Sequence, residues 1–251
     1  MTRKTSVTTE GELMMDSRQA CVSLEPSNSA NTGLPGDPDY SFDVKAIQPA
    51  GTFDGRIHND VHLPAPMELA HRELISETRR LQDAVMAADA PLESLLTATQ
   101  SIRGAAKVLE AHHVDWRASI AGMQMHLPGR GQTLSPPIYI DEMDKVHLRA
   151  HWSFTRFYTG GGGAVHGGAI PLVADELCGR FAEYVHGQRA RTAYIKVDYR
   201  KVTPVDREVG LEARVERHQG RKLFVRASIV DGDDLLCEVE GLFISLLPGQ
   251  P

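Results

Sequence analysis

A glycine-rich stretch followed by an acidic residue carries the groups in this sequence that could do chemistry. The stretch TGGGGAVHGG covers residues 159–168 and contains one histidine, His166, while Asp175 and Glu176 follow inside an apolar segment. A glycine loop that leads into a helix leaves backbone N–H groups unpaired at the positive end of the helix dipole. These groups could bind either a phosphate or the negative charge that develops on an attacked carbonyl.

The two kinds of anion need different neighbouring residues. No Gly-Lys-Ser/Thr ending and no GxGxxG turn accompanies the glycines, which argues against a nucleotide phosphate. An attacked carbonyl needs a nucleophile or a base, and no Gly-x-Ser-x-Gly elbow supplies a serine. Asp175 is therefore the candidate base or nucleophile. It would act on a substrate bound by the glycine loop of its own chain or by that of a partner chain. Residues 159–163 are expected to be only a flexible lead-in without chemistry.

A helix from Gly168 to about His186 is expected to position Asp175. Its core-facing positions on a helical wheel are Ile170, Val173, Ala174, Leu177, Phe181 and Val185. A polar stripe of the same helix contains Glu176, Arg180 and Glu183. Glu176 and Arg180 have the i,i+4 spacing of an ion pair, so Glu176 already has a structural role and ranks below Asp175 as a catalytic carboxylate.

Asp175 falls in a third sector of this helix. Its companions there are small or apolar, namely Pro171, Leu172, Gly179 and Ala182. A surface helix would carry charges in such a sector, so small residues indicate a close neighbour, either another subunit or a ligand. The alternative is that Asp175 is an ordinary solvated side chain.

Most of the sequence after residue 116 alternates apolar and polar residues, as half-buried strands do. The clearest strand covers 146–155, with an apolar face of Val146, Leu148, Ala150, Trp152 and Phe154. Strand 192–202 has an apolar face of Ala193, Ile195, Val197 and Tyr199. Other strands are expected over 138–140, 209–217, 223–229 and 235–243, with short turns at 218–221 and 231–234. The fold class is therefore α+β, with one antiparallel sheet packed against one central helix.

The N-terminal part is different in character. Residues 1–60 are rich in Ser, Thr, Gly, Pro and Asp without periodicity, which predicts disorder. Residues 61–114 are expected to form a helical extension of two amphipathic helices, one from Pro66 to about Val85 and one from Pro91 to about His112. The second helix has a predicted buried side of Leu92, Leu95, Leu96, Ile102 and Leu109. The adjacent histidines 112 and 113 do not share a helical face, which argues against a metal site there.

Composition excludes several classes of protein. With 27 Lys+Arg against 33 Asp+Glu the formal charge is −6, which argues against nucleic-acid binding. Three widely spaced cysteines without a CxxC pair fit a reducing compartment. Neither a membrane-spanning run nor a secretory or transit peptide is expected, so we predict a cytoplasmic protein.

The motif His166-Gly167-Gly168, followed by Asp175 nine positions after the histidine and then by Gly179, resembles the HGG-motif (PaaI-like) acyl-CoA thioesterases. These belong to the hotdog-fold 4-hydroxybenzoyl-CoA thioesterase superfamily. The segment TAYIKVDYRKVTPV resembles the family's next strand, and GRGQTLSPPIYID resembles the entry to its first long strand. The resemblance covers roughly residues 115–247, so the hotdog domain is placed at 115–251.

The resemblance implies a curved antiparallel sheet around the helix, and homodimers or homotetramers with sites at the dimer interface. Asp175 would be the general base or nucleophile for hydrolysis of an acyl-CoA thioester. The Gly168 N–H would polarise the thioester carbonyl, Gly167 would shape the turn, and His166 would orient the loop or assist polarisation. Thr192 would hold the attacking water, although the stretch from Asp175 to Thr192 is one residue longer than the family pattern. No metal and no cofactor are implied.

Coenzyme A carries phosphates, so basic residues near the site are expected to bind its nucleotide part. The candidates are Arg200 and Lys201 after one strand, and Arg221 and Lys222 at a hairpin turn. The main alternative function is a non-catalytic hotdog protein that binds acyl-CoA as a sensor or scaffold. A DNA-binding acyl-CoA regulator is disfavoured because the N-terminal helices have no basic face, and a hotdog hydratase because its paired Asp and His are missing.

Overall fold

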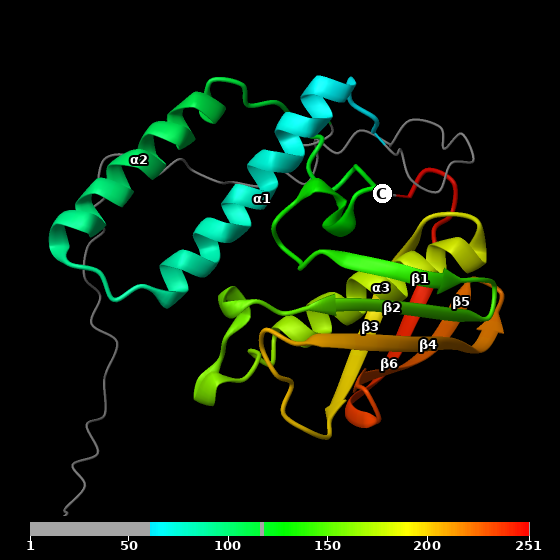
Figure 1. Cartoon of the computed structure of the whole chain (residues 1–251). Helices are drawn as coiled ribbons and strands as arrows, with labels where there is room; N and C mark the ends of the chain where they lie inside the picture. Colours follow the sequence, from blue (N-terminus) through cyan, green and yellow to red (C-terminus); the bar gives the residue numbers. More distant parts are fainter. Residues whose placement is uncertain (1–60, 116–117, 251) are drawn as a thin grey trace, which may run out of the picture. The chain divides into compact units, whose positions relative to one another are not determined.

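The computed structural model describes residues 61–115 and 118–250. The prediction of disorder for residues 1–60 lies outside the described residues. Figure 1 shows a sheet with one long helix against it and two further helices that come before the sheet in the sequence. None of the described helices combines the length and the apolar character that crossing a bilayer requires.

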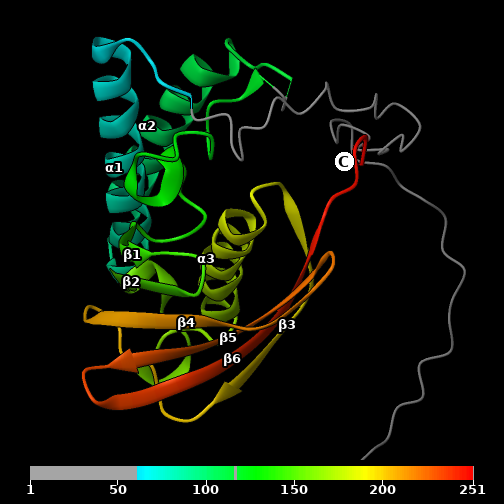
Figure 2. The ribbon, with the colours of Figure 1, turned by 90° about the vertical axis from the view of Figure 1, so that its right-hand side faces the viewer.

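Six antiparallel strands form the sheet, in the spatial order β1-β2-β4-β5-β6-β3. They are β1 (Ile138–Met143), β2 (His147–Ser153), β3 (Ala190–Tyr199), β4 (Glu208–Gln219), β5 (Lys222–Asp231) and β6 (Asp234–Ser245). Helix α3 (Ala169–His186) lies against the inner face of the curved sheet, as Figure 2 shows. The predicted α+β class and hotdog arrangement are confirmed, and β3 is an edge strand of the sheet.

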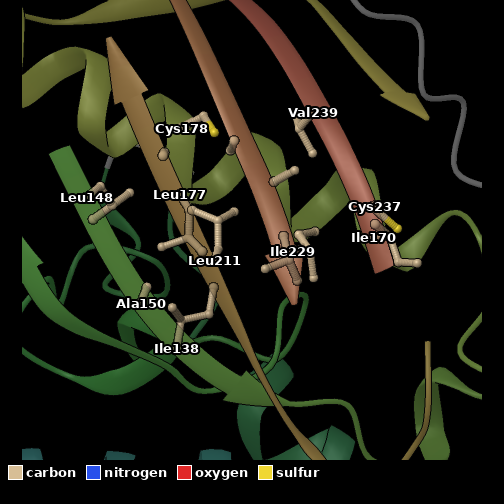
Figure 3. Close-up of a cluster of buried hydrophobic side chains, with 14 of the residues drawn as sticks. Ile138, Leu148, Ala150, Ile170, Leu177, Cys178, Leu211, Ile229, Cys237 and Val239 are labelled. Atoms are coloured by element: carbon tan, nitrogen blue, oxygen red, sulfur yellow. The ribbon is translucent and has the colours of Figure 1, made fainter. Parts of the chain in front are cut away.

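Alternating side chains build the core between the sheet and α3 (Figure 3). The apolar face predicted for α3 is buried, apart from Val185, which is half-buried at the end of the helix. The sheet contributes the inward residues Leu148, Ala150, Trp152, Leu211, Ile229, Cys237 and Val239. Burial of such side chains contributes about 25 cal/mol per Å² of apolar surface, so this layer is the main stabilising contact of α3.

Besides Ala193, which is exposed in β3, two residues depart from the alternation predicted for the strands. Val146 is exposed because it belongs to the turn before β2, where Asp144 Oδ1 accepts hydrogen bonds from the backbone N–H groups of Val146 and His147. Tyr199 is 53% exposed and does not join the apolar core. Both side chains lie where the strand pattern ends, and local hydrogen bonds there override hydrophobic periodicity.

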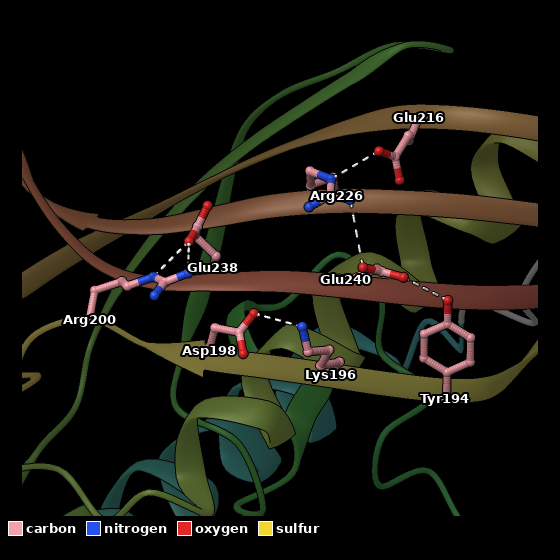
Figure 4. A network of polar contacts seen from close by, with 8 residues as sticks. All are labelled: Tyr194, Lys196, Asp198, Arg200, Glu216, Arg226, Glu238 and Glu240. Atoms are coloured by element: carbon pink, nitrogen blue, oxygen red, sulfur yellow. Dashed lines mark hydrogen bonds and ion pairs between the residues drawn. The ribbon is translucent and has the colours of Figure 1, made fainter.

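The outer face of the sheet carries charged and polar pairs (Figure 4). Tyr194 Oη donates to Glu240 Oε1 at 2.9 Å, and Arg226 lies between Glu216 and Glu240. Exposed pairs of this kind contribute little to the stability of the fold, because solvent screens them. They cover the outer surface of β3, β5 and β6, whereas the candidate site residues Asp175 and Thr192 bond to each other between α3 and β3.

The predicted helical extension is present as α1 (Ala65–Ala87) and α2 (Leu92–Glu110). Helix α1 contacts the rest of the chain through polar groups, because Phe157 N–H donates to Asp83 Oδ1 at 2.9 Å and Arg79 donates to the carbonyl of Gln132. The predicted buried side of α2 is wrong for the single chain: Leu92, Leu95, Leu96, Ile102 and Leu109 are all exposed. Periodicity identifies a face that favours burial, but the described residues provide nothing that covers it.

Candidate active site

The glycine loop before α3 is a closed structure that presents His166. Residues Thr159 and Val165 pair as an isolated β-bridge, and Gly160 N–H donates to the carbonyl of Ala164 at 2.7 Å. His166 N–H donates to the carbonyl of Tyr158 at 2.7 Å. A side chain at Gly160 would place its Cβ 2.8 Å from His166 Cα, so the absence of a side chain allows this close approach. The segment expected to be a flexible lead-in therefore fixes the position of His166.

The His166 side chain folds back onto the loop. Its Nδ1 accepts a hydrogen bond from the Gly168 N–H at 3.0 Å. A ring nitrogen that accepts cannot carry a proton, so the neutral ring carries its proton on Nε2, which then donates outward. The Gly168 N–H predicted to polarise a carbonyl is thus already bonded in this structure. None of the described residues accepts a hydrogen bond from the neighbouring Gly167 N–H.

Tyr199, at the end of β3, contacts the candidate site and is not among the residues that the sequence analysis predicts for it. Its hydroxyl donates to the carbonyl of Gly167 at 2.7 Å. Burial raises the pKa of Tyr199, so the hydroxyl keeps the proton that it donates. The peptide unit between Gly167 and Gly168 is therefore held at both ends, by Tyr199 at its carbonyl and by His166 at its N–H.

Asp175 and Thr192 form the second half of the site. Thr192 Oγ1 donates to Asp175 Oδ1 at 2.7 Å, which brings together a residue of α3 and a residue of β3. Both residues are exposed in the single chain, so Asp175 does not lie in the core. The register of β3 shifts between Thr192 and Tyr194, which makes Ala193 an extra residue in a β-bulge. Bulges of this kind re-aim neighbouring side chains.

The two halves lie at different levels of α3. Asp175 follows Gly168 by seven residues, which corresponds to two helical turns and about 10 Å along the axis. The predicted site residues thus appear as two local groups on one side of α3. One contains the loop His166–Gly168 with Tyr199, and the other contains Asp175 with Thr192.

Two other reactive residues on α3 have structural roles. Glu176 Oε2 forms an ion pair with Arg130 at 2.8 Å and also attracts Arg180, as the i,i+4 spacing predicts. Cys178 is fully buried, and burial together with the nearby Asp175 carboxylate raises the pKa of its thiol to about 12. A thiol with this pKa is protonated at neutral pH and cannot act as a nucleophile.

A cavity of about 410 Å³ opens next to the glycine loop. Its lining includes Val165, Gly167, Ile170, Tyr199, Arg200 and Lys201. The two basic side chains are balanced by acids of β6, since Arg200 pairs with Glu238 and Lys201 with Asp234 (Figure 4 shows the first pair). Gly167 and the two basic side chains therefore line the same cavity. A ligand with both a carbonyl and a phosphate needs contacts of these two kinds.

The other predicted basic pair lies elsewhere in the chain. Arg221 donates to the carbonyl of Ser245 at 3.1 Å, in the hairpin that joins β4 to β5. His218 of this hairpin packs against His186, the last residue of α3, with ring centroids 4.9 Å apart. Within one chain, Arg221 and Lys222 are thus near the C-terminal end of α3, whereas Arg200 and Lys201 are near its N-terminal end.

Comparisons with known proteins agree with this architecture. Residues 162–238 match the family model of the thioesterase superfamily. Acyl-coenzyme A thioesterase THEM4 of Xenopus laevis is 36% identical over 88 residues, and THEM4 of Mus musculus is 36% identical over 91 residues. These matches cover 34% and 36% of this chain and only 39% of each relative.

A solved structure gives the fold over a longer part of the chain. A thioesterase superfamily protein superposes with a TM-score of 0.61 at 24% identity, covering 70% of this chain and 90% of the other. The family match itself includes α3 and the part of the glycine stretch from residue 162 onward, and it ends within β6. Residues 162–238 are therefore similar to the thioesterase superfamily, and the described chain has the hotdog fold.

Proposed function

We propose that this protein is an acyl-CoA thioesterase, which hydrolyses an acyl-CoA to a free acid and coenzyme A. The observation that carries the proposal is the bond between Thr192 Oγ1 and Asp175 Oδ1, formed on the exposed side of α3. The names of the curated relatives and the superfamily match support the same chemistry. The cavity beside Gly167, with its two basic residues, supports a ligand that carries phosphates.

In the proposed reaction, Asp175 activates water. The hydroxyl of Thr192 donates a hydrogen bond to Asp175 Oδ1. The lone pairs of Thr192 Oγ1 and the second carboxylate oxygen of Asp175 therefore both remain to accept hydrogen bonds from one water. Asp175 takes a proton from this water as its oxygen attacks the thioester carbon. The tetrahedral intermediate then breaks its C–S bond, and the departing thiolate takes up the proton. Two acceptors around one water favour this route over direct attack by Asp175.

The oxyanion of the intermediate needs hydrogen-bond donors that are already in place. We assign this role to the Gly167 N–H and to the Nε2–H of His166, because His166 Nδ1 holds the Gly168 N–H. Gly168 becomes a donor to substrate only if the imidazole ring turns away. Tyr199 fixes the Gly167 carbonyl and is a positioning residue.

The complete site is proposed to form between two copies of the chain. Asp175 and Thr192 are exposed in one chain, and β3, which carries Thr192, is an unpaired edge of the sheet. A second copy against this edge would place its glycine loop opposite Asp175 and cover the third sector of α3. We therefore expect a homodimer, or a homotetramer made from such dimers. The buried free thiols of Cys178 and Cys237 support a reducing compartment such as the cytoplasm.

We further propose that Arg200 and Lys201 bind the phosphates of coenzyme A. Both line the cavity that includes Gly167, and both are about half exposed. Arg221 and Lys222 would contribute only through a neighbouring copy, because they lie at the other end of α3. Replacing Lys201 with Ala should raise KM for acyl-CoA about tenfold with little change in kcat.

Release of free thiol from a panel of acyl-CoAs of different chain lengths tests the proposed function. Asp175→Asn should lower kcat by about 10²- to 10⁴-fold, the usual contribution of a general base, without loss of acyl-CoA binding. Asp198→Asn is the matched control, because Asp198 lies on the outer face of β3 and pairs with Lys196. Tight acyl-CoA binding without turnover, with the same affinity in Asp175→Asn as in the wild type, would instead identify a non-catalytic binding protein.

A further inference from the structure

Two histidines and one glutamate converge where the start of α1 meets the segment before β1, apart from the candidate active site. They are His62 before α1, Glu68 in the first turn of α1, and His126 in the segment before β1. One ligand atom from each residue lies within 4.8 Å of the others. We propose that these three side chains bind a divalent transition-metal ion of the zinc class.

The contacts among the three side chains favour a shared ion. His126 Nε2 lies 3.2 Å from Glu68 Oε2, and the rings of His62 and His126 stack with their centroids 4.3 Å apart. One nitrogen of each ring already lies within 4.8 Å of a carboxylate oxygen of Glu68, so a small rotation of the side chains brings the three ligand atoms to one ion. The cluster has the composition of a His₂Glu site, a set that zinc accepts in proteins.

The backbone holds these residues together without an ion. Val61 N–H donates to the carbonyl of Met123 at 2.9 Å, which joins the segment of His62 to the segment of His126. The carbonyl of Pro64 accepts from the N–H of Glu68 at 3.0 Å, which fixes the first turn of α1. A site of this kind is preorganised, so little ordering free energy opposes binding of the metal.

The spacing of the ligand atoms suits a first-row transition metal. Zinc bonds of about 2.0–2.1 Å in tetrahedral geometry place ligand atoms about 3.3 Å apart. His126 and Glu68 already have this spacing, and the remaining ligand atom has to move by at most about 1.5 Å. Imidazole nitrogen selects zinc, cobalt or nickel over magnesium, which prefers oxygen ligands.

The arrangement leaves a fourth position for water. The side chains of His126 and Glu68 are 25% and 28% exposed, so solvent reaches the cluster. The metal would connect the start of α1 to the segment that leads to Arg130, the partner of Glu176 on α3. Its inferred role is a clip between the helical extension and the loop before β1. This inference does not depend on thioesterase activity.

Metal binding is measured on the full chain after removal of metals with a chelator. Cobalt(II), which reports tetrahedral coordination through visible absorption bands, should saturate at one equivalent per chain, and zinc should displace it. Zinc at a hundredfold excess over its Kd should raise Tm by roughly 5–10 °C. Magnesium at the same concentration should leave Tm unchanged.

Variants separate this site from the other histidines of the chain. Glu68→Gln and His62→Ala should each weaken zinc binding at least tenfold and abolish the rise in Tm, whereas the double variant His112→Ala/His113→Ala should bind as the wild type does. Circular dichroism shows that each variant is folded. Absence of cobalt bands at one equivalent, or wild-type zinc affinity in a folded Glu68→Gln variant, would overturn the proposal.

Discussion

Replacement of Tyr199 with Phe tests whether the hydrogen bond from Tyr199 to the Gly167 carbonyl positions the proposed oxyanion donors of the glycine loop. The change removes only the hydroxyl that donates to the Gly167 carbonyl at 2.7 Å and keeps the ring that lines the cavity. The Gly167–Gly168 peptide unit would then be held only by the bond from Gly168 N–H to His166. Because the ring remains, KM for acyl-CoA should change little, and the effect should appear in kcat.

The size of the effect follows from the bond that is lost. A neutral hydrogen bond contributes about 0.5–1.5 kcal/mol net. Tyr199 is 53% exposed, so water can replace the hydroxyl at the Gly167 carbonyl. The free energy of unfolding should therefore fall by only about 0.5 kcal/mol. If the bond acts on the positioning of the oxyanion donors, the same range corresponds to a roughly 2- to 13-fold fall in kcat.

The assay measures thiol release under saturating acyl-CoA, together with denaturant unfolding of the same samples. Tyr194→Phe is the matched control: this tyrosine is also on β3 and also donates, to Glu240 at 2.9 Å, but on the outer face of the sheet. The control should retain wild-type kcat. A wild-type kcat in Tyr199→Phe, or equal losses in both variants, would refute the positioning role. A fall beyond about 100-fold would also refute it, since Tyr199 would then act on the reacting atoms themselves.

Two further predictions concern the loop and the helix. Gly160→Ala should lower kcat and reduce the free energy of unfolding by about 1–3 kcal/mol, because its Cβ would lie 2.8 Å from His166 Cα. Gly161→Ala, which meets no atom within 4 Å, should change neither quantity in the same assays, and equal behaviour of the two variants would contradict the argument. Cys178 should stay unmodified when the native protein is treated with iodoacetamide at pH 8, because burial raises the pKa of its thiol to about 12. Peptide mass mapping detects this, and labelling as fast as that of unfolded protein would show that α3 is not packed as described.

The elements that the sequence predicts well are those with strong periodicity over many residues. The core face of α3 and the strands β4, β5 and β6 follow from apolar spacing alone, because one side of each must be buried. The glycines of the two hairpin turns predict left-handed backbone conformations there, and Gly220 and Gly232 have φ values of +56° and +59°. Helices α1 and α2 were found by the same rule, but periodicity does not say what covers an apolar face.

The site was less predictable, because it depends on single hydrogen bonds. The spacing of His166 and Asp175 indicated the two halves, yet nothing in the sequence shows that Nδ1 of the histidine takes up the Gly168 N–H. Tyr199 was assigned to the apolar face by alternation, whereas its hydroxyl reaches the loop. The candidate metal ligands have no recognisable spacing in the sequence, because 58 residues separate Glu68 from His126. Contacts between distant segments have no local signature.

The bulge in β3 allows one strand to contribute a hydroxyl to each half of the candidate site. Thr192 and Tyr199 are seven positions apart, an odd number, and in a regular strand they would point to opposite faces of the sheet. The extra residue, Ala193, restores even parity, since the partners on β6 are Phe243 and Cys237, six positions apart and both buried. Deleting Ala193 would therefore do more than shorten a strand. It would turn one of the two hydroxyls outward and leave either the carboxylate or the glycine loop without its partner.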